Sequence, residues 1–509
     1  MEKFLYKRNT KKNADYNIWF AFPGCYSFAM SSLGYLHIFK LMDEMDEVNV
    51  ERVYSDSTKT EIQFKDVNAI AFSSSFDLDF MSIFPMFDKY KIPYKAANRD
   101  ETMPIIFCGG PVVTANPIPY KDFFDFMIIG DGENLNTKVV TILADNKDLP
   151  KPEILKILAK LDGVYVPTLN QPTVIKNSCK IENCVYTPIL SDDAFFKDMF
   201  ILEISRGCAN CCGFCMASYL NLPVRFAPYE NIIEALNLGL KYTNKIALLG
   251  AQVSIHPKFK QICKYIYNRV QENPEIEMSI SSLRVDAVDD SIIKTLVAAH
   301  QKHVTIAIEA GSERLRKVIN KNITEEQIKK TVETARLNGL KGIKVYAMIG
   351  IPTERQEDLE EMVRLAKELK QANKGFDISF AFSSFIPKPH TPLQWCGRFS
   401  TKELEKRQNF LQKEFHKIGI KTSFSSIKWD YWQTVLSRGD EKMSDFIIDV
   451  YKNGSKLGAF KKSAKDKFNP DDYVLRNYDL NETLPWDIID LPPRKEVLIE
   501  RHKKLLNLQ

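Results

Sequence analysis

The amino-acid sequence predicts an α/β protein with two successive series of parallel strands and a mainly helical C-terminal region. Short apolar runs alternate with segments of helical spacing over residues 1–150, and the same alternation returns between residues 198 and 400. The first series is typical of a doubly wound, Rossmann-like sheet. The second has six strand-and-helix units, which indicates a partial (β/α)6 barrel rather than a full barrel.

Five strands and three helical segments make up the first series. We expect the strands at residues 16–22, 48–54, 67–73, 104–110 and 123–130, and the helices at 28–45, at 77–90 and after Glu133. Ligands of such sheets bind at the carboxyl ends of the strands. The turns at these ends include GGP at 109–111, NPIP at 116–119 and GDGEN at 130–134. They are candidate ligand loops, because glycine lets a backbone approach a ligand closely.

The second series follows a stretch of weak periodicity. We interpret this stretch, residues 171–197 with Cys179 and Cys184, as a connection between a domain of residues 1–170 and a barrel of residues 198–400. Barrel strands are expected at 198–207, 245–250, 276–282, 303–311, 342–350 and 376–385. Helices are expected between them, for instance at 229–241, 291–300 and 354–371. Residues 401–509 form a Lys-rich, mainly helical extension.

The composition is that of a soluble globular protein rather than of a fibrous, disordered or membrane protein, and it does not by itself indicate nucleic-acid binding. Hydrophobic residues make up 44% and charged residues 27% of the chain, and 70 basic against 65 acidic side chains leave a net charge of +5. There is no apolar run long enough to span a membrane and no apolar segment of a signal peptide. We therefore expect a cytoplasmic protein with no membrane association.

Four of the ten cysteines lie within eight positions, in CANCCGFC at 208–215. Cys208, Cys212 and Cys215 have the spacing C-x3-C-x2-C, although Cys208, Cys211 and Cys215 offer a second triplet. A four-iron cluster normally takes four thiolates, so three ligands leave one iron open for a substrate. Zinc is the alternative, but zinc sites usually join two separated cysteine pairs. The segment therefore favours a catalytic 4Fe-4S cluster over a structural metal.

An open iron can chelate the amino and carboxylate groups of S-adenosylmethionine. One electron passed to the sulfonium splits that molecule into methionine and a 5'-deoxyadenosyl radical, and the protein contributes positioning and exclusion of side reactions. The predicted chemistry is therefore radical formation at the cysteine loop.

Segments spread over nearly the whole chain resemble one known family. The chain is similar to radical S-adenosylmethionine proteins that carry an N-terminal cobalamin-binding-type domain, and this resemblance favours Cys212 over Cys211 as a cluster ligand. The matching segments are EISRGCANCCGFCMAS (203–218), SSLRVD (281–286), EAGSERLRKVINKNIT (309–324), YAMIGIPTERQEDLE (346–360), FIPKPHTPLQW (385–395), SRGD (437–440) and LPWDIID (484–490).

The resemblance implies S-adenosylmethionine contacts at Phe214, Gly250, Ser282, Glu309 and Arg314. Three of these follow predicted barrel strands, as do Cys208, Gly350 and Pro387, and barrel active sites are built at this face.

Several of these candidate residues have a purely structural alternative. Gly350 with Pro352 could serve only a turn, and Glu309 could pair with an Arg such as Arg314. Arg206 and Arg284 could bind a carboxylate or form surface ion pairs. His256, His303 and His390 lack metal-ligand spacing, so we interpret them as structural.

The resemblance also implies a corrinoid beneath the loops that contain Gly109, Gly110, Gly130, Gly132 and Glu133. The usual cobalt-ligating motif of such domains is D-x-H-x-x-G. The only histidine before residue 200 is His37, with Tyr35 where Asp would stand and Lys40 where Gly would stand. It lies in an amphipathic helical pattern, where a lone His is usually a packing or surface residue. We therefore expect any cobalamin to lack a histidine lower ligand, and a cofactor-free scaffold domain remains the alternative.

The predicted function is that of a radical S-adenosylmethionine enzyme that transfers a methyl, methylthio or related group. The alternative is a non-catalytic iron–sulfur electron-transfer or cobalamin-sensing protein. The family implies an electron donor such as flavodoxin or ferredoxin as partner. It leaves both RNA and protein open as substrates.

Overall fold

The computed structural model describes residues 1–8, 14–57 and 59–507. Its N-terminal sheet has the strand order β3-β2-β4-β5-β6-β7, parallel except for β7. Numbered along the chain, the five parallel strands have the order 2-1-3-4-5, which is the flavodoxin-like arrangement with its switch point between β2 and β4. The strands are β2 (Tyr16–Phe22), β3 (Val48–Tyr54), β4 (Ala69–Ser73), β5 (Ile105–Gly109), β6 (Phe126–Ile128) and β7 (Val164–Tyr165).

Each face of this sheet is buried by a different set of helices, because successive strand residues point to opposite sides. On one face, Ile18, Phe20 and Phe107 pack against α2 (Leu33–Asp43), α5 (Glu133–Asp145) and α6 (Lys151–Leu158). On the other face, Trp19 and Phe72 pack against the 3-10 helix η2 (Asp77–Ile83) and α3 (Phe84–Tyr90). The predicted doubly wound domain is confirmed.

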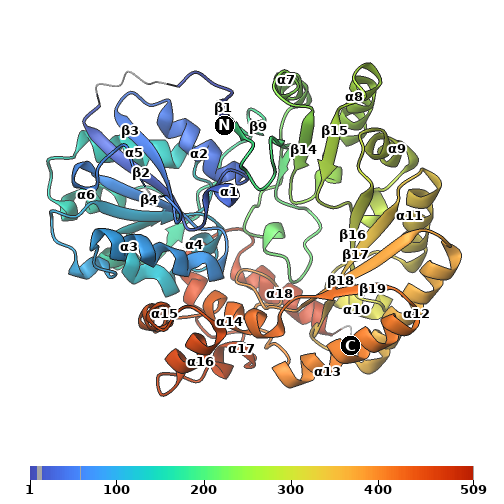
Figure 1. Ribbon diagram of the computed structural model, residues 1–509. Coiled ribbons are helices and arrows are strands. Elements are labelled where there is room, and N and C mark those ends of the chain that lie inside the picture. The colour runs from blue at the N-terminus through green and yellow to red at the C-terminus, as the bar shows by residue number, and fades with distance from the viewer. Residues whose placement is uncertain (9–13, 58, 508–509) are drawn as a thin grey trace.

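The second series forms a partial barrel of two parallel sheets (Figure 1). The sheet β15-β14-β11 carries the antiparallel β9 (Val185–Tyr186) at its edge, and a bridge between Leu283 and Ile306 joins it to the sheet β16-β17-β18-β19. All six predicted barrel strands are present. They are β11 (Phe200–Glu203), β14 (Lys245–Leu249), β15 (Glu277–Ile280), β16 (His303–Glu309), β17 (Gly342–Ile349) and β18 (Asp377–Ser384).

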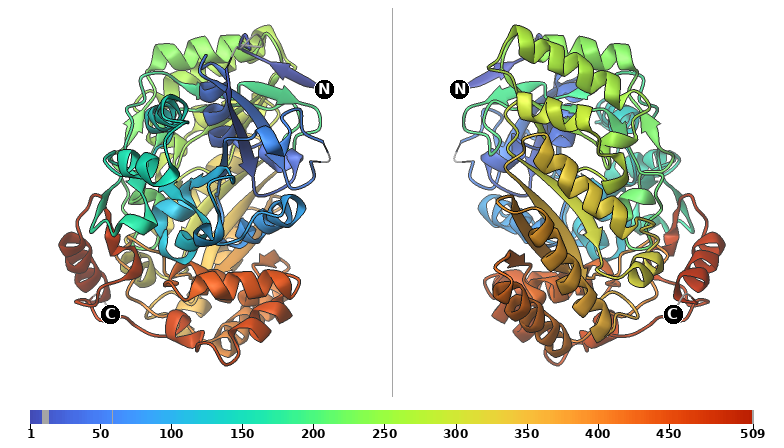
Figure 2. Two further views of the ribbon diagram at one scale, coloured as in Figure 1. Left: turned by 90° about the vertical axis from the view of Figure 1, so that its left-hand side faces the viewer. Right: turned by 90° about the vertical axis from the view of Figure 1, so that its right-hand side faces the viewer.

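Helices cover the outer face of both barrel sheets (Figures 1 and 2). One continuous core joins the alternate strand residues, such as Ile306, Val345 and Phe380, to these helices. The opposite face of the strands lines the lumen of the barrel. The outer helices are α7 (Tyr229–Gly239), α8 (Phe259–Glu272), α9 (Asp290–Ala298), α11 (Glu325–Leu337), α12 (Gln356–Ala372) and α13 (Thr401–Lys417).

The C-terminal extension returns to the N-terminal domain. Trp432, Phe446 and Phe460 from its helices share a core with the face of the N-terminal sheet that bears η2 and α3. The extension contains β19 (Lys421–Phe424), α14 (Ile427–Ser437), α15 (Met443–Lys452), α16 (Leu457–Ala464), α17 (Asp471–Val474), β20 (Ile489–Asp490) and α18 (Lys495–Leu506).

Residues 171–197 contribute three short strands that tie separate parts of the chain together. β8 (Val174–Ile175) pairs with β20, β9 pairs with β11, and β10 (Ile189–Ser191) pairs with β1 (Glu2–Phe4) near the N-terminus. Within the described ranges, no helix has the length and apolar character that a membrane crossing requires.

Candidate functional site

The cysteine loop follows β12 (Ser205–Arg206) at the carboxyl end of the first barrel strand. Cys208 and Cys212 are 8% and 7% exposed, and Cys215 is half-buried. Backbone hydrogen bonds fix the loop, since the Gly213 amide donates to the Ile319 carbonyl at 2.9 Å and the Leu393 amide donates to the Gly213 carbonyl at 3.0 Å. Segments about 100 and 180 residues further along the chain therefore hold the loop in place.

Three of the four thiols share one environment. Burial raises the pKa of Cys212 to about 12, with Cys215 and Glu309 close enough to raise it further and Lys321 and Arg284 close enough to oppose them. Burial also raises the pKa of Cys215, and the nearby Cys208 raises it further. A bare thiolate is therefore costly here, and a bound cation would remove that cost.

Cys211 belongs to a different environment. Its backbone is left-handed, with φ of +50°, and its carbonyl accepts hydrogen bonds from the Tyr219 hydroxyl and the Asn320 amide, both at 2.9 Å. Its side chain packs against the aromatic cluster around Tyr219 and Trp395. Burial lowers the pKa of Arg501, but the neighbouring Cys211 and Tyr219 outweigh burial and leave that pKa raised. Cys211 thus contacts α18 rather than the other three thiols.

Glu309 ends β16 in a strained conformation beside this loop. Its φ is +65°, directly after a β-bulge, and such backbone strain tends to gather at functional sites. The Lys321 ammonium lies 3.1 Å from its carboxylate, and Lys321 is 8% exposed. The sequence suggested Arg314 as an alternative partner for Glu309. Arg314 instead pairs with Asp358 and donates to the Thr353 carbonyl at 3.0 Å.

The remaining predicted S-adenosylmethionine contacts lie around the same mouth of the barrel. Gly250 follows β14, where a Cβ atom would come within 2.3 Å of the Ser205 hydroxyl and 3.0 Å of the Ser205 carbonyl oxygen, so Ser205 would have to move. Ser282 is half-buried after β15. Phe214 packs against the small core that contains Leu393 and Leu505. Gly350 also closes a strand, and its amide donates to the Glu354 carboxylate at 2.9 Å.

Arg284 lies near Cys212, and its guanidinium donates to the Asp286 carboxylate at 2.8 Å. The three histidines that the sequence predicts to be structural make backbone or surface contacts. His256 contacts the Ala227 carbonyl at 2.9 Å, His390 contacts the Ala115 carbonyl at 3.0 Å, and His303 lies 3.7 Å from Asp377. In the parts of the chain that the structure describes, no three His, Cys, Asp or Glu side chains gather tightly enough to surround a single metal ion.

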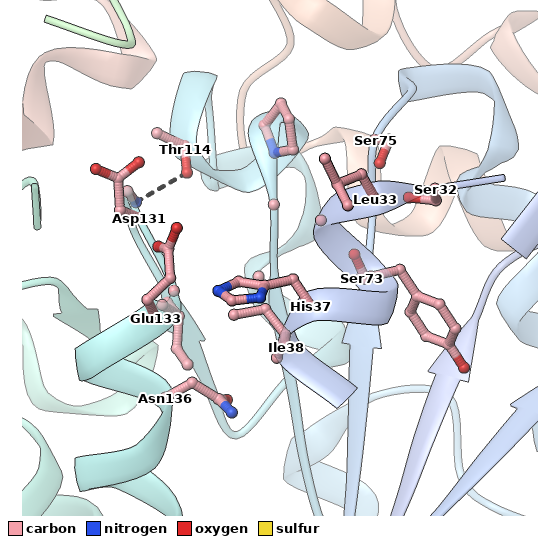
Figure 3. A pocket seen from close by; sticks show the side chains of 18 of the residues that line it. Ser32, Leu33, His37, Ile38, Ser73, Ser75, Thr114, Asp131, Glu133 and Asn136 are labelled. Atoms are coloured by element: carbon pink, nitrogen blue, oxygen red, sulfur yellow. Dashed lines mark hydrogen bonds between the residues drawn. The ribbon is translucent and has the colours of Figure 1, made fainter. Parts of the chain in front are cut away.

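A cavity of about 550 Å³ lies at the carboxyl ends of β4, β5 and β6 (Figure 3). All five predicted loop residues, Gly109, Gly110, Gly130, Gly132 and Glu133, line it. Its other wall comes from the barrel and includes Glu203, Arg206, Leu249 and the residues Met216 and Ala217 that follow Cys215. The cavity therefore extends from the N-terminal sheet to the end of the cysteine loop.

Two glycines of this cavity cannot be replaced without moving backbone. Gly110 has φ of +110°, and a Cβ atom there would lie 2.4 Å from the Ser74 carbonyl oxygen. Gly130 has φ of +104°, and its Cβ atom would lie 2.1 Å from the Asn177 carbonyl oxygen. Both positions need the left-handed region that glycine adopts freely.

Two polar side chains of the cavity wall, Asn136 and His37, are placed to contact a bound ligand. Asn136 is 4% exposed, and its side-chain nitrogen has no hydrogen-bond partner within the described structure. His37 was expected to pack or to face solvent, but it lines the cavity from α2 and faces the same hollow as Glu133 of α5 (Figure 3). Burial lowers the pKa of His37 to about 4, so its imidazole is neutral near pH 7.

An ion-pair network connects the cavity to the barrel. Arg206 lies 2.7 Å from Glu203, 3.1 Å from Asp131 and 2.6 Å from Glu133, and its side chain is 15% exposed. Burial would raise the pKa of Asp131, but Arg206 and Arg225 hold it below its usual value. The guanidinium of Arg206 already pairs with three carboxylates. It is therefore not free to bind a ligand carboxylate, and its ion pairs are largely buried rather than on the surface.

Comparison with known proteins gives consistent matches for the N-terminal domain and for most of the barrel. Residues 34–167 match the family model of the N-terminal region of radical SAM proteins, and residues 202–366 match that of the radical SAM superfamily. The uncharacterized protein MJ0966 of Methanocaldococcus jannaschii is 29% identical over 450 residues, which cover 87% of this chain and 92% of that protein. The uncharacterized methyltransferase PH0819 of Pyrococcus horikoshii is 27% identical and covers 71% of this chain, with 77% of its own length matched.

Among solved structures, the cobalamin-dependent S-adenosylmethionine radical enzyme OxsB, with aqua-cobalamin and S-adenosylmethionine bound, has a similar fold. The superposition has a TM-score of 0.54, covers 96% of this chain and 80% of OxsB, and has 12% sequence identity. This likeness concerns the arrangement of the N-terminal domain and the barrel as a whole.

Proposed function

We propose that this chain, which belongs to the radical S-adenosylmethionine proteins with an N-terminal cobalamin-type domain, transfers a methyl, methylthio or related group by radical chemistry. The observation that carries the proposal is the cavity of the N-terminal domain, whose far wall is the segment directly after Cys215. A cofactor in the cavity and a cofactor on the cysteine loop would therefore face one another. The name of PH0819 supports methyl transfer as the reaction class.

Cys208, Cys212 and Cys215 would hold a 4Fe-4S cluster. Their fit rests on two buried thiols and one half-buried thiol in one fixed loop, with Cys211 turned towards α18. When bound, such a cluster supplies the electron that cleaves S-adenosylmethionine to methionine and a 5'-deoxyadenosyl radical, and a donor such as flavodoxin or ferredoxin would replenish that electron.

Glu309 and Lys321 would orient the amino-acid end of S-adenosylmethionine. They present opposite charges 3.1 Å apart beside Cys212, so a carboxylate can accept from the Lys321 ammonium while an amino group donates to Glu309. Sequence reasoning missed Lys321, because an isolated Lys after a helical segment is usually solvated. Gly250 and Ser282 would complete the rim, and Arg314 would act through the loop at Thr353 that it holds.

The N-terminal cavity would take part of a cobalamin. Its volume of about 550 Å³ suits a drug-sized group, and the unpartnered amide of Asn136 supplies a donor at its wall. Gly109, Gly110, Gly130 and Gly132 would let backbone approach the ligand, and Glu133 remains paired with Arg206. His37 would face the ligand as a neutral group without ligating cobalt, since it lacks the motif that orients a ligating imidazole.

The test is the fate of S-adenosylmethionine. Anaerobically purified, iron-loaded protein with a chemical reductant should release 5'-deoxyadenosine, measured by chromatography, whereas the variant Cys212→Ala should release none. An electron-transfer or cobalamin-sensing protein would leave S-adenosylmethionine intact. Wild-type protein that carries the cluster and is reduced, yet forms no 5'-deoxyadenosine, would contradict the proposal.

A further inference from the structure

The lumen face of the sheet β16-β17-β18-β19 differs sharply from its outer face. The outer residues are buried against α11, α12 and α13, whereas the lumen residues are small or polar and partly exposed. These lumen residues are Thr305, Ala307, Lys344, Tyr346, Ser379, Ala381, Lys421 and Ser423. In Figure 1 the covering helices α11 and α12 lie on one side of these strands and the N-terminal domain lies on the other, so the face without helices is turned towards the N-terminal domain.

Tyr346 is the one large aromatic side chain among these lumen residues, and it is 42% exposed. Its register neighbours are Ala307 on β16 and Ala381 on β18, so no bulky side chain flanks the ring on either adjacent strand. The Lys344 ammonium lies 5.3 Å from the ring centroid. Because alanines flank the ring on both adjacent strands, the ring face that Lys344 does not cover offers a surface on which a planar group can stack.

Two lysines on the same face lie one residue row away from Tyr346. Lys344 aligns with Ser379, and Ser379 aligns with Lys421, which places the two lysines two strand spacings apart, about 10 Å. Neither lysine pairs with a carboxylate anywhere in the described chain. Among the described residues of these strands, Glu309 pairs with Lys321, and Asp377, 3.7 Å from the His303 ring, is the one further carboxylate on this face, so the two lysines outnumber it. The lysines therefore leave a positive potential beside the aromatic ring.

We propose that the lumen binds one nucleotide of a single-stranded nucleic acid, with its base stacked on Tyr346 and its phosphate held by Lys344 and Lys421. A free aromatic face beside unpaired cations is the combination by which proteins hold single strands without reading sequence. A neutral peptide would leave both ammonium groups without counterions. This inference rests on the proposed function, because it names the substrate class of the same barrel.

The probe is a fluorescently labelled single-stranded RNA of twelve nucleotides, titrated with the full, iron-loaded chain and followed by anisotropy. Tyr346→Leu should weaken binding roughly 5- to 150-fold, the range that base stacking supplies, whereas Tyr346→Phe should retain affinity within about twofold. Lys344→Gln should lower the slope of log affinity against log salt by about 0.7. The matched control is Tyr267→Leu, which removes a tyrosine of α8 that is 38% exposed on the outer surface.

Parallel titrations with DNA of the same sequence and with adenosine monophosphate show whether the site binds RNA, DNA or a free mononucleotide. Tighter binding of either polymer than of the mononucleotide supports the inference. Equal affinity of wild type and Tyr346→Leu would overturn it, as would absence of binding by wild type. Loss of S-adenosylmethionine affinity in Tyr346→Leu would also overturn it, because the ring would then serve that cofactor. If wild type forms 5'-deoxyadenosine but binds no nucleic acid, this inference fails while the proposed function stands.

Discussion

The cysteine loop and the N-terminal cavity are specified in different ways. The loop presents three thiols on a backbone held by Ile319 and Leu393, and the Glu309–Lys321 pair lies beside it. The cavity presents many side chains from both domains, on loops whose backbone path depends on Gly110 and Gly130, where a Cβ atom would meet a carbonyl oxygen. A small charged ligand needs a few exact groups, whereas a large flat ligand needs shape. Substitutions should therefore act in an all-or-none manner at the three cysteines and in a graded manner at the Glu309–Lys321 pair and at the cavity.

The largest effect is expected at the cysteines. Cys208→Ala, Cys212→Ala and Cys215→Ala should each abolish iron binding, because a four-iron cluster cannot be held by two thiolates. Cys211→Ala should keep about four irons per chain, since its side chain packs against α18. Iron content and the visible absorption of anaerobically purified protein provide the measurement. Loss of iron in Cys211→Ala with retention of iron in Cys212→Ala would show that Cys211, and not Cys212, is the cluster ligand.

A clear but smaller effect is expected for the cavity backbone. Gly110→Ala should lower the retention of hydroxocobalamin, because its Cβ atom meets the Ser74 carbonyl at 2.4 Å and shifts the loop. Gly34→Ala is the matched control, since Gly34 lines the same cavity from α2 with open space around it. Gly34→Ala should retain the corrinoid and gain up to about 1 kcal/mol in unfolding free energy from helix propensity. Visible spectra after gel filtration separate the two variants, and equal retention would remove the Gly110 loop from the site.

Substitutions in the Glu309–Lys321 pair test which side chains contact S-adenosylmethionine. Lys321→Met should weaken S-adenosylmethionine binding by roughly tenfold, the value of one charge-assisted hydrogen bond, but should leave the affinity for its decarboxylated analogue unchanged. Glu309→Gln should weaken both ligands, because each carries the amino group. Equilibrium dialysis with iron-loaded protein measures all four affinities. Arg314→Met tests the remaining candidate. A larger loss of S-adenosylmethionine affinity in Arg314→Met than in Lys321→Met would mean that Arg314 contacts the ligand directly.

The smallest effect is expected at Asn136. Replacing a buried amide that has no partner by an apolar group is neutral or stabilising for the empty protein. Asn136→Leu should therefore leave the unfolding free energy of corrinoid-free protein unchanged or higher, while lowering hydroxocobalamin affinity roughly 2- to 10-fold. Denaturant unfolding and spectroscopic titration give the two numbers. A destabilised empty protein with unchanged affinity would mean that Asn136 serves the fold alone.

His37 allows a spectroscopic check of the same cavity. The visible spectrum of bound hydroxocobalamin should be the same in His37→Ala as in wild type, because the imidazole is expected to face the ligand without ligating cobalt. A spectral shift that depends on His37 would establish a histidine ligand and overturn this expectation.

The sequence predicted the strands of the fold better than the contacts between its parts. All six barrel strands and five strands of the N-terminal sheet follow from apolar runs, whereas β19 has the sequence KTSF and gives no such signal. The short strands β8, β9 and β10 were also missed, since they consist of two or three residues that are ordered by partners far along the chain. Pairing across long separations leaves no local periodicity.

The same limit applies to the site. Cys208, Cys212 and Cys215 could be found because their spacing is local, and the glycine loops because they follow strands. Lys321 and the position of His37 in the cavity wall could not be found, because each depends on how α2, α5 and β16 pack in space. Arg206 was recognised as a binder of carboxylates, but its three partners come from two domains and are visible only in the structure.

We propose that two separately built sites, the thiols of the cysteine loop and the loops that line the N-terminal cavity, face each other across one cavity. The most direct test measures iron and bound corrinoid in the same samples of Cys212→Ala and Gly110→Ala, each loaded with iron, sulfide and hydroxocobalamin under anaerobic conditions. We expect Cys212→Ala to lose iron and keep the corrinoid, and Gly110→Ala to keep iron and retain less corrinoid. Failure of wild type to retain any corrinoid, or loss of both cofactors together in either variant, would contradict the account.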